Sequence, residues 1–146
     1  MSDPIRLAVI GNPVAHSRSP ELHLGFAKQL GMTLEYDRVE CAPGEFIDTA
    51  NRLRETGYAG ANVTVPFKAD AFALCDTRTP VAELAQAVNT LHFVDHSVLG
   101  DNTDGPGFIR DLTSRCGIDV AHKTVIIIGA GGAVRGLMKP LLDQNP

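Results

Sequence analysis

The chain has 146 residues, of which 44% are hydrophobic and 21% are charged, and its formal net charge at pH 7 is -4. This length and this composition are typical of about one globular, soluble domain. The negative charge argues against a nucleic-acid-binding protein, which would normally present a basic face to the phosphates. It leaves small anionic ligands open, because one well-placed cation can bind those.

The sequence shows no signal for secretion or for membrane insertion. The apolar run that ends at Ile10 is too short for a signal peptide and lacks its basic flank. No run approaches the roughly 18 apolar residues of a membrane span. The cysteines, Cys41, Cys75 and Cys116, are scattered and lack metal-ligand spacing. We therefore expect a cytoplasmic protein with reduced thiols and no bound metal.

Strands and helices alternate along the first part of the chain. The apolar run at residues 5–10 predicts a buried strand, and a polar loop follows it. Ser19 precedes a proline as a helix N-cap would, and Gly31 is a natural stop, so a helix is predicted between them. Side chains that alternate between two faces over residues 33–40 predict a second strand. Apolar residues at helical spacing over residues 44–56 predict a second helix.

The second part of the chain continues this alternation and adds a hairpin. The remaining predicted elements are a strand at 60–66, helices at 67–74 and 81–87, a hairpin turning at Asp95 and His96, a helix at 104–117, and a strand at 125–128 followed by a glycine turn and a helix. Such an order predicts an α/β fold with an open, mostly parallel sheet flanked by helices. An incomplete Rossmann-type β-α unit follows the sheet.

The pattern divides the chain into three parts. Residues 1–103 contain the sheet, residues 104–122 form a connecting helix and linker, and residues 123–146 begin a truncated dinucleotide-binding domain.

Two hydroxyls lie two residues apart in the loop after the first strand. Ser17 and Ser19 can both reach one carboxylate, helped by the positive end of the helix that begins at Pro20. The alternative is structural, with Ser19 only capping the helix and Ser17 only part of the loop. Their spacing alone leaves both interpretations open.

The third strand ends in a polar cluster. Asn62 and Thr64 point to one side of the strand, and Lys68 follows just beyond its end. Ligands of open α/β sheets bind at the carboxyl ends of the strands, so these side chains are candidates for a site. Lys68 begins a helix, where the helix dipole disfavours its charge, and local rules tend to break at functional sites. A solvated surface lysine is the alternative.

Asn89, Asn102 and Asp104 supply further polar groups. Turn and helix-capping roles explain Asn102 and Asp104 adequately by themselves. A lysine and an aspartate brought together, however, can transfer a proton to or from a substrate hydroxyl. The five histidines do not cluster, so a packing or surface role is expected for each.

Five segments give the chain a resemblance to shikimate dehydrogenases, in which similar segments occur in the same order. They are GNPVAHSRSP (residues 11–20), ANVTVPFK (61–68), AVNT (87–90), GDNTDG (100–105) and GAGGA (129–133). Together they span most of the chain. The resemblance implies NADPH-dependent reduction of 3-dehydroshikimate to shikimate in aromatic amino-acid (chorismate) biosynthesis, with no nucleic-acid or membrane partner. It leaves a homodimer open.

The resemblance also implies the roles of individual residues. The implied substrate-binding residues are Ser17, Ser19, Asn62, Thr64, Lys68, Asn89 and Asp104. The serine pair matches the groups that hold the substrate carboxylate. Lys68 matches the catalytic lysine, paired with Asp104, and would deliver a proton to the C3 oxygen as hydride arrives on that carbon. On this resemblance, residues 1–103 are the substrate-binding catalytic domain.

The glycine segment matches the pyrophosphate end of an NADP(H) site. Its implied cofactor-binding residues are Gly129, Ala130, Gly131, Gly132 and Ala133. Two departures are Val134, where the fingerprint has a small residue, and Gln86, where the family commonly has glycine.

The sequence ends at Pro146, soon after this segment, so the walls of a complete dinucleotide site are not in it. We expect little turnover by this chain alone, and we expect its unpaired apolar strand to favour aggregation. A shikimate-binding module without catalysis, or a quinate or aminoshikimate dehydrogenase relative, are the alternatives.

Overall fold

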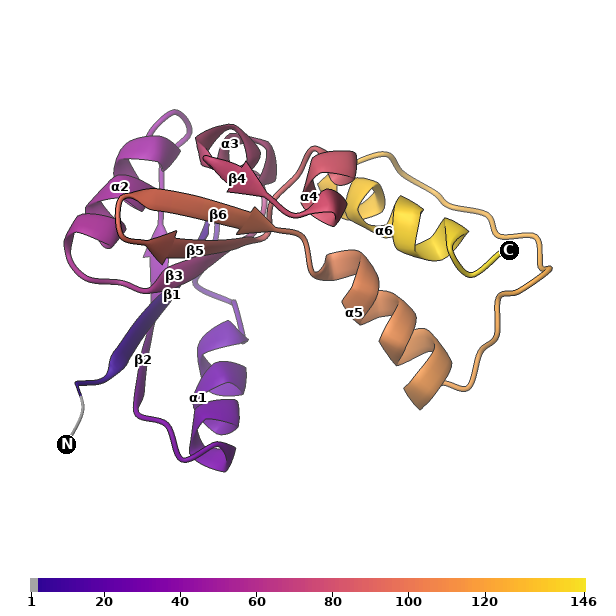
Figure 1. Cartoon of the computed structure of the whole chain (residues 1–146), viewed down its shortest axis with the longest axis horizontal. Helices are drawn as coiled ribbons and strands as arrows, with labels where there is room; N and C mark the ends of the chain where they lie inside the picture. The colour runs from indigo at the N-terminus through magenta and orange to yellow at the C-terminus, as the bar shows by residue number, and fades with distance from the viewer. Residues whose placement is uncertain (1–2) are drawn as a thin grey trace.

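A computed structural model describes residues 3–146. Its centre is a six-stranded sheet in the order β2-β1-β3-β5-β6-β4 (Figure 1). The strands are β1 (Ile5–Gly11), β2 (Leu34–Glu40), β3 (Gly60–Val63), β4 (Thr77–Arg78), β5 (Thr90–Val94) and β6 (Ser97–Asp101). β1 pairs in parallel with β2 and β3, and β4 pairs in parallel with β6, whereas β5 is antiparallel to β3 and β6. The α/β fold predicted from the sequence is confirmed, and the hairpin turns at Asp95 and His96 as expected.

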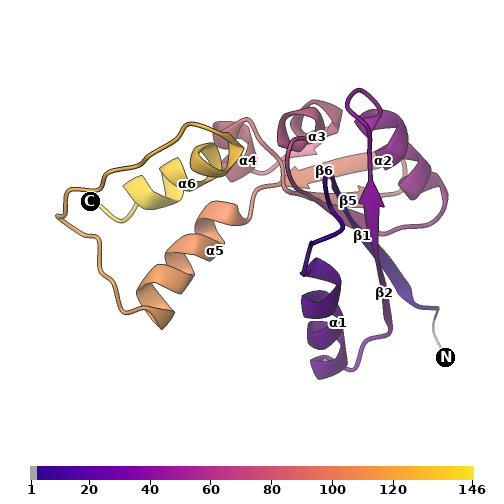
Figure 2. The same ribbon diagram turned by 180° about the vertical axis from the view of Figure 1, so that it is seen from behind.

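Six α-helices surround this sheet or extend from it. They are α1 (Ser19–Gln29), α2 (Phe46–Glu55), α3 (Lys68–Leu74), α4 (Pro80–Ala85), α5 (Asp104–Arg110) and α6 (Gly132–Leu142), and a π-helical turn (Asp111–Arg115) continues α5. α2 and α3 lie on one face of the sheet and α1 lies on the other, as the views from the front and from behind both show (Figures 1 and 2). The sheet is therefore the middle layer of three.

The predicted N-cap role of Ser19 is wrong. Arg18 occupies the N-cap position of α1, no side chain caps this helix end, and Ser19 is its first residue. The Ser19 hydroxyl instead accepts a hydrogen bond of 3.2 Å from the Ser17 hydroxyl.

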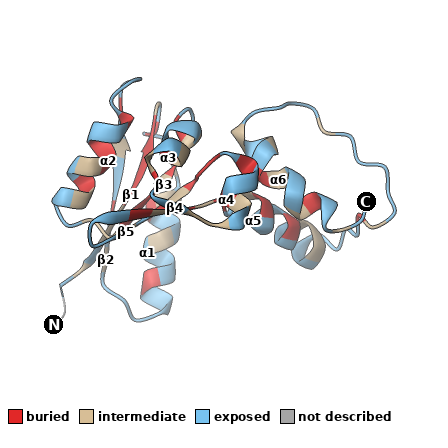
Figure 3. Cartoon of the chain, turned by 45° about the horizontal axis from the view of Figure 1, so that its top comes forward, coloured by how far each residue is buried: buried red, intermediate tan, exposed pale blue. Residues whose placement is uncertain are grey.

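The main core lies between the sheet and the helices α2 and α3. Alternate residues of β1 divide between two faces, so that Ala8 and Ile10 join this core while Val9 packs with Tyr36 on the α1 side. The rings of Phe46 and Phe67 stack at 5.4 Å between centroids in the main core. Figure 3 shows the buried residues concentrated along the strands and the inward faces of the helices.

A second, smaller hydrophobic cluster joins α5 to α6. Ile109, Val120 and Leu141 are buried there, apart from the main core. Two glycines allow the close approach of these helices, because a Cβ at Gly105 would lie only 2.1 Å from the carbonyl oxygen of Gly136. α6 is thereby held next to α4 and α5 (Figures 1 and 2).

The strand predicted at residues 125–128 does not form. Residues 123–130 run as an extended, irregular connection in which Ile126 and Ile128 are 83% and 96% exposed. Among the described residues no strand pairs with this segment. A strand needs a neighbour for its backbone N–H and C=O groups, and without one the sequence preference is not enough.

Within residues 3–146, no helix has the length and apolar character needed to span a membrane.

Candidate functional site

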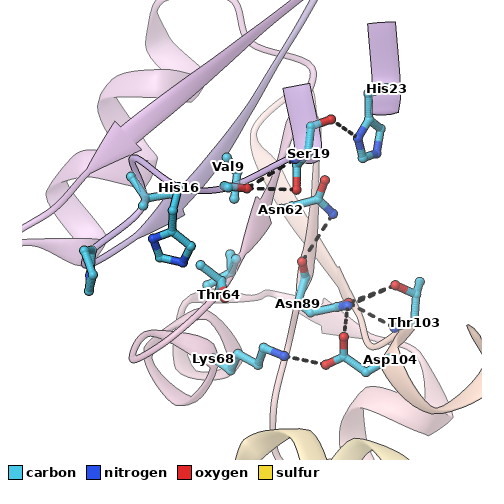
Figure 4. A pocket seen from close by; sticks show the side chains of 14 residues that line it. Val9, His16, Ser19, His23, Asn62, Thr64, Lys68, Asn89, Thr103 and Asp104 are labelled. Atoms are coloured by element: carbon cyan, nitrogen blue, oxygen red, sulfur yellow. Dashed lines mark hydrogen bonds and ion pairs between the residues drawn. The ribbon is translucent and has the colours of Figure 1, made fainter. Parts of the chain in front are cut away.

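A polar cavity of about 370 Å³ opens at the carboxyl ends of β1 and β3 (Figure 4). Backbone hydrogen bonds join the two loops that follow these strands, since Asn12 N donates to Val65 O at 3.0 Å. The cavity is lined by Val9, Pro13, Val14, His16, Ser17, Ser19, His23, Asn62, Val63, Thr64, Lys68, Asn89, Thr103 and Asp104. The structure thus brings to one place all seven residues that the sequence offered as a substrate site.

Lys68 and Asp104 form an ion pair inside this cavity. Lys68 Nζ lies 2.5 Å from Asp104 Oδ2, and the side chains are 16% and 31% exposed. Asn89 Nδ2 donates to the other carboxylate oxygen, Oδ1, at 2.8 Å. Both oxygens of Asp104 are therefore held, which aims the carboxylate at the lysine. An ammonium group has three donors, so Lys68 can bond to Asp104 and to a ligand oxygen together.

Asn89 connects the strand β5 to the start of α5. Its Nδ2 also donates to Thr103 Oγ1 at 3.0 Å, and its Oδ1 accepts from Thr103 N at 2.9 Å. Thr103 is a cavity residue that sequence reasoning missed, and its position inside the GDNTDG segment was the one available signal. Asn102, 1% exposed, accepts from Asp104 N at 3.2 Å, which confirms the turn role expected for it.

The opposite end of the cavity carries the two serines and two histidines. Ser19 N donates to Ser17 Oγ at 3.3 Å, which keeps the two hydroxyls together. His16 and His23 also line the cavity, although the sequence favoured packing or surface roles for them. His23 Nδ1 lies 2.8 Å from Ser19 O, and because a carbonyl only accepts, this nitrogen carries the hydrogen.

The glycine segment forms one wall of a second cavity, of about 390 Å³, which shares Lys68 with the first. Gly131, Gly132 and Ala133 line it, whereas Gly129 and Ala130 do not. A Cβ at Gly131 would meet open space, and that residue is the N-cap of α6 without any side-chain cap. The free N–H groups of this first turn fit a phosphate or pyrophosphate.

Gln86 lies on the other side of this second cavity and is the C-cap of α4. Its backbone is left-handed, with φ 47° and ψ 39°, a conformation that glycine adopts more easily. This left-handed geometry explains why the family commonly has glycine at this position. The turn still delivers Asn89 into the first cavity. Among residues 3–146 there is no cluster of His, Cys, Asp and Glu side chains suited to a metal ion.

The fold and the cavity define an α/β domain with a polar site of small-molecule size. Residues 9–91 match the family model for the shikimate dehydrogenase substrate binding domain. The chain is also 48% identical over 141 residues to the shikimate dehydrogenase (NADP(+)) of Methylobacillus flagellatus, covering 97% of this chain and 52% of that relative. The chain belongs to the shikimate dehydrogenase family.

Solved structures support the same assignment. The Ael1 enzyme of Pseudomonas putida superposes with a TM-score of 0.91 at 40% identity, over 97% of this chain and 52% of that one. Shikimate 5-dehydrogenase of Thermus thermophilus, in complex with NADP(H) and shikimate, gives a TM-score of 0.88 at 34% identity, over 95% of this chain and 52% of that one. The chain spans about half the length of the relatives that it matches.

Proposed function

We propose that the first cavity binds shikimate and 3-dehydroshikimate and that the chain serves their NADP-dependent interconversion. The observation that carries this proposal is the ion pair of Lys68 and Asp104, which lies inside a cavity that also holds the two serine hydroxyls. A cation beside a carboxylate at one end and paired hydroxyls at the other suit a hydroxylated ring acid. The Thermus relative, whose structure is a complex with NADP(H) and shikimate, supports the choice of ligands.

The proposed chemistry gives each residue a role. Ser17 and Ser19 would donate to the ligand carboxylate, and Thr64 and Asn89 would bind its ring hydroxyls. NADPH, when bound, supplies the hydride. In the reductive direction Lys68 Nζ would donate a proton to the C3 oxygen, and Asp104 would hold the ammonium in position for that transfer.

We also propose that residues 1–103 form the substrate-binding catalytic domain, that residues 104–122 connect, and that residues 123–146 begin the NADP-binding domain. The separation of the main core from the cluster between α5 and α6 supports this division, because the main core draws on residues 8–98 and the other cluster on residues 109–141. The first turn of α6, with Gly131, Gly132 and Ala133, would hold the pyrophosphate.

A homodimer and a cytoplasmic location complete the proposal. Leu22 and Phe26 of α1 and its C-cap residue Leu30 form an apolar stripe that is 53–72% exposed, which supports self-association. Sedimentation equilibrium tests this part, and a monomer at micromolar concentration would contradict it. The three free cysteines support a reducing compartment.

Lys68→Ala tests the catalytic part. We expect it to keep most shikimate affinity, measured by calorimetry, and, in a chain extended to the length of its relatives, to lower turnover of shikimate with NADP+ by about 10²–10⁴-fold, the usual contribution of a positioned acid or base. Unchanged turnover would remove Lys68 from the mechanism. Quinate and aminoshikimate, assayed beside shikimate, test the substrate, and faster turnover of either would transfer the proposal to that acid.

A shikimate-binding module without turnover is the second candidate. It is favoured by a specific observation, since the first cavity lies at the ends of paired strands whereas residues 125–128 have no strand neighbour among the described residues. On this candidate shikimate raises the melting temperature and NADP+ does not. Equal protection by NADP+, or robust turnover by the pure chain, would contradict it.

A further inference from the structure

The edge strand β2 contacts residues that line the first cavity without lining the cavity itself. None of its seven described residues lines that cavity, yet two of them bond to groups that do. Tyr36 Oη donates to Asn62 Oδ1 at 2.5 Å, and Arg38 donates from Nε and Nη2 to Ser17 O at 2.9 and 2.7 Å. Tyr36 and Arg38 are two residues apart and so share one face of the strand.

The Tyr36 phenol is held as a hydrogen-bond donor. Its side chain is buried, and its ring stacks on the His23 ring with centroids 4.7 Å apart and an interplanar angle of 26°. Burial raises the pKa of Tyr36 to about 12, against the opposing effect of a hydrogen bond with the Ser19 side chain. At neutral pH the phenol therefore carries its hydrogen and gives it to Asn62.

This donor and the Asn89 carbonyl together set which way the Asn62 amide points. An amide has an accepting oxygen and a donating nitrogen at opposite ends, and the two ends exchange when the group rotates by half a turn. In this structure the phenol donates to Oδ1, which therefore lies on the β2 side. On the other side Nδ2 lies 3.5 Å from the carbonyl oxygen of Asn89 and 3.4 Å from Thr90 Oγ1, and both of these groups can accept.

We propose that Tyr36 is a positioning residue that fixes the orientation of the Asn62 side chain in the lining of the first cavity, and so sets how that amide meets the ligand. The identity of that ligand rests on the proposed function, and shikimate is the probe. Tyr36 does not line the cavity itself, and the proposal assigns its effect on the ligand to its hydrogen bond with Asn62.

Tyr36→Phe removes the hydroxyl and keeps the ring that stacks on His23. We expect the Kd for shikimate, measured by calorimetry, to rise about tenfold, the effect of losing one well-oriented hydrogen bond. Tyr58→Phe is the matched control, because Tyr58 Oη also donates at 2.5 Å to a side-chain oxygen, that of Asp37, away from the cavity. Its Kd should stay within about twofold of the wild type.

A double-mutant cycle separates positioning from general loosening of the fold. If Tyr36 acts through Asn62, the double variant Tyr36→Phe/Asn62→Ala binds shikimate no more weakly than Asn62→Ala alone. Additive losses of affinity would overturn the proposal. So would a tenfold loss in Tyr58→Phe, because the effect would then not depend on contact with the cavity.

Nuclear magnetic resonance of the unliganded chain gives a readout that does not depend on the ligand. The side-chain amide resonances of Asn62 should shift in Tyr36→Phe and should stay in place in Tyr58→Phe. The wild type by itself should show a slowly exchanging Tyr36 hydroxyl proton, even if the variant does not fold. Unmoved Asn62 resonances, or no such proton, would overturn the positioning role. Failure of the wild type to bind shikimate would overturn the proposed function instead.

Discussion

Two apolar segments of similar composition differ in this molecule, because one forms a buried strand and the other forms none. IRLAVI, residues 5–10, forms β1, which pairs on both sides and buries Ile10 completely. TVIIIG, residues 124–129, forms no strand, and Ile128 is 96% exposed. Intrinsic preference for extended backbone is strong in both segments. The difference shows that a strand depends on its neighbours, which β1 has and the later segment lacks among the described residues.

The same contrast separates the two cavities. The first cavity lies at the ends of paired strands, and the loops and helix starts that follow the strands place every predicted substrate residue in its lining. The second cavity has the glycine turn on one side and Gln86 on the other, and an exposed connection leads into that turn. Stability and binding should therefore concentrate in residues 3–103.

The largest expected effect comes from the main core. Phe46→Ala removes a ring that is 2% exposed and stacked on Phe67, so it should lower the free energy of unfolding by about 3–5 kcal/mol. Urea denaturation followed by circular dichroism measures this loss. A loss below about 1 kcal/mol would mean that the main core does not dominate stability.

A smaller effect is expected where α6 meets α5. Gly105→Ala would place a Cβ 2.1 Å from the Gly136 carbonyl oxygen, so α6 must shift, at a cost of about 1–3 kcal/mol. Hydrogen exchange should then accelerate in α6 while β1 stays protected. Gly25→Ala is the matched control: its Cβ would meet open space on α1, and helix propensity should add up to about 1 kcal/mol of stability. Equal effects of the two variants would contradict the close packing.

The smallest effect is expected in the irregular connection. Ile126→Lys combined with Ile128→Lys should change the free energy of unfolding by less than about 0.5 kcal/mol, because both side chains are already in water. Self-association, followed by light scattering, should decrease. Loss of stability in this double variant would show that the segment is paired in solution, and the contrast with β1 would fail.

The sequence by itself determined the alternation of elements, the α/β class and seven of the residues that line the first cavity. Regular apolar spacing and the Asp95–His96 turn gave most elements nearly correct bounds. The five segments pointed to the family and to its polar residues, because residue type and order along the chain carry that information without coordinates.

Only the tertiary structure decided which of the predicted elements form and which residues contact one another. It paired the two-residue β4, too short for any periodicity, with β6, and it left residues 125–128 unpaired. The roles of Thr103 and Tyr36 could not be predicted from the sequence either. Thr103 bonds to Asn89, 14 positions away, and Tyr36 bonds to Asn62, 26 positions away. Local preference is read along the chain, whereas strand pairing and side-chain orientation depend on partners that only folding brings together.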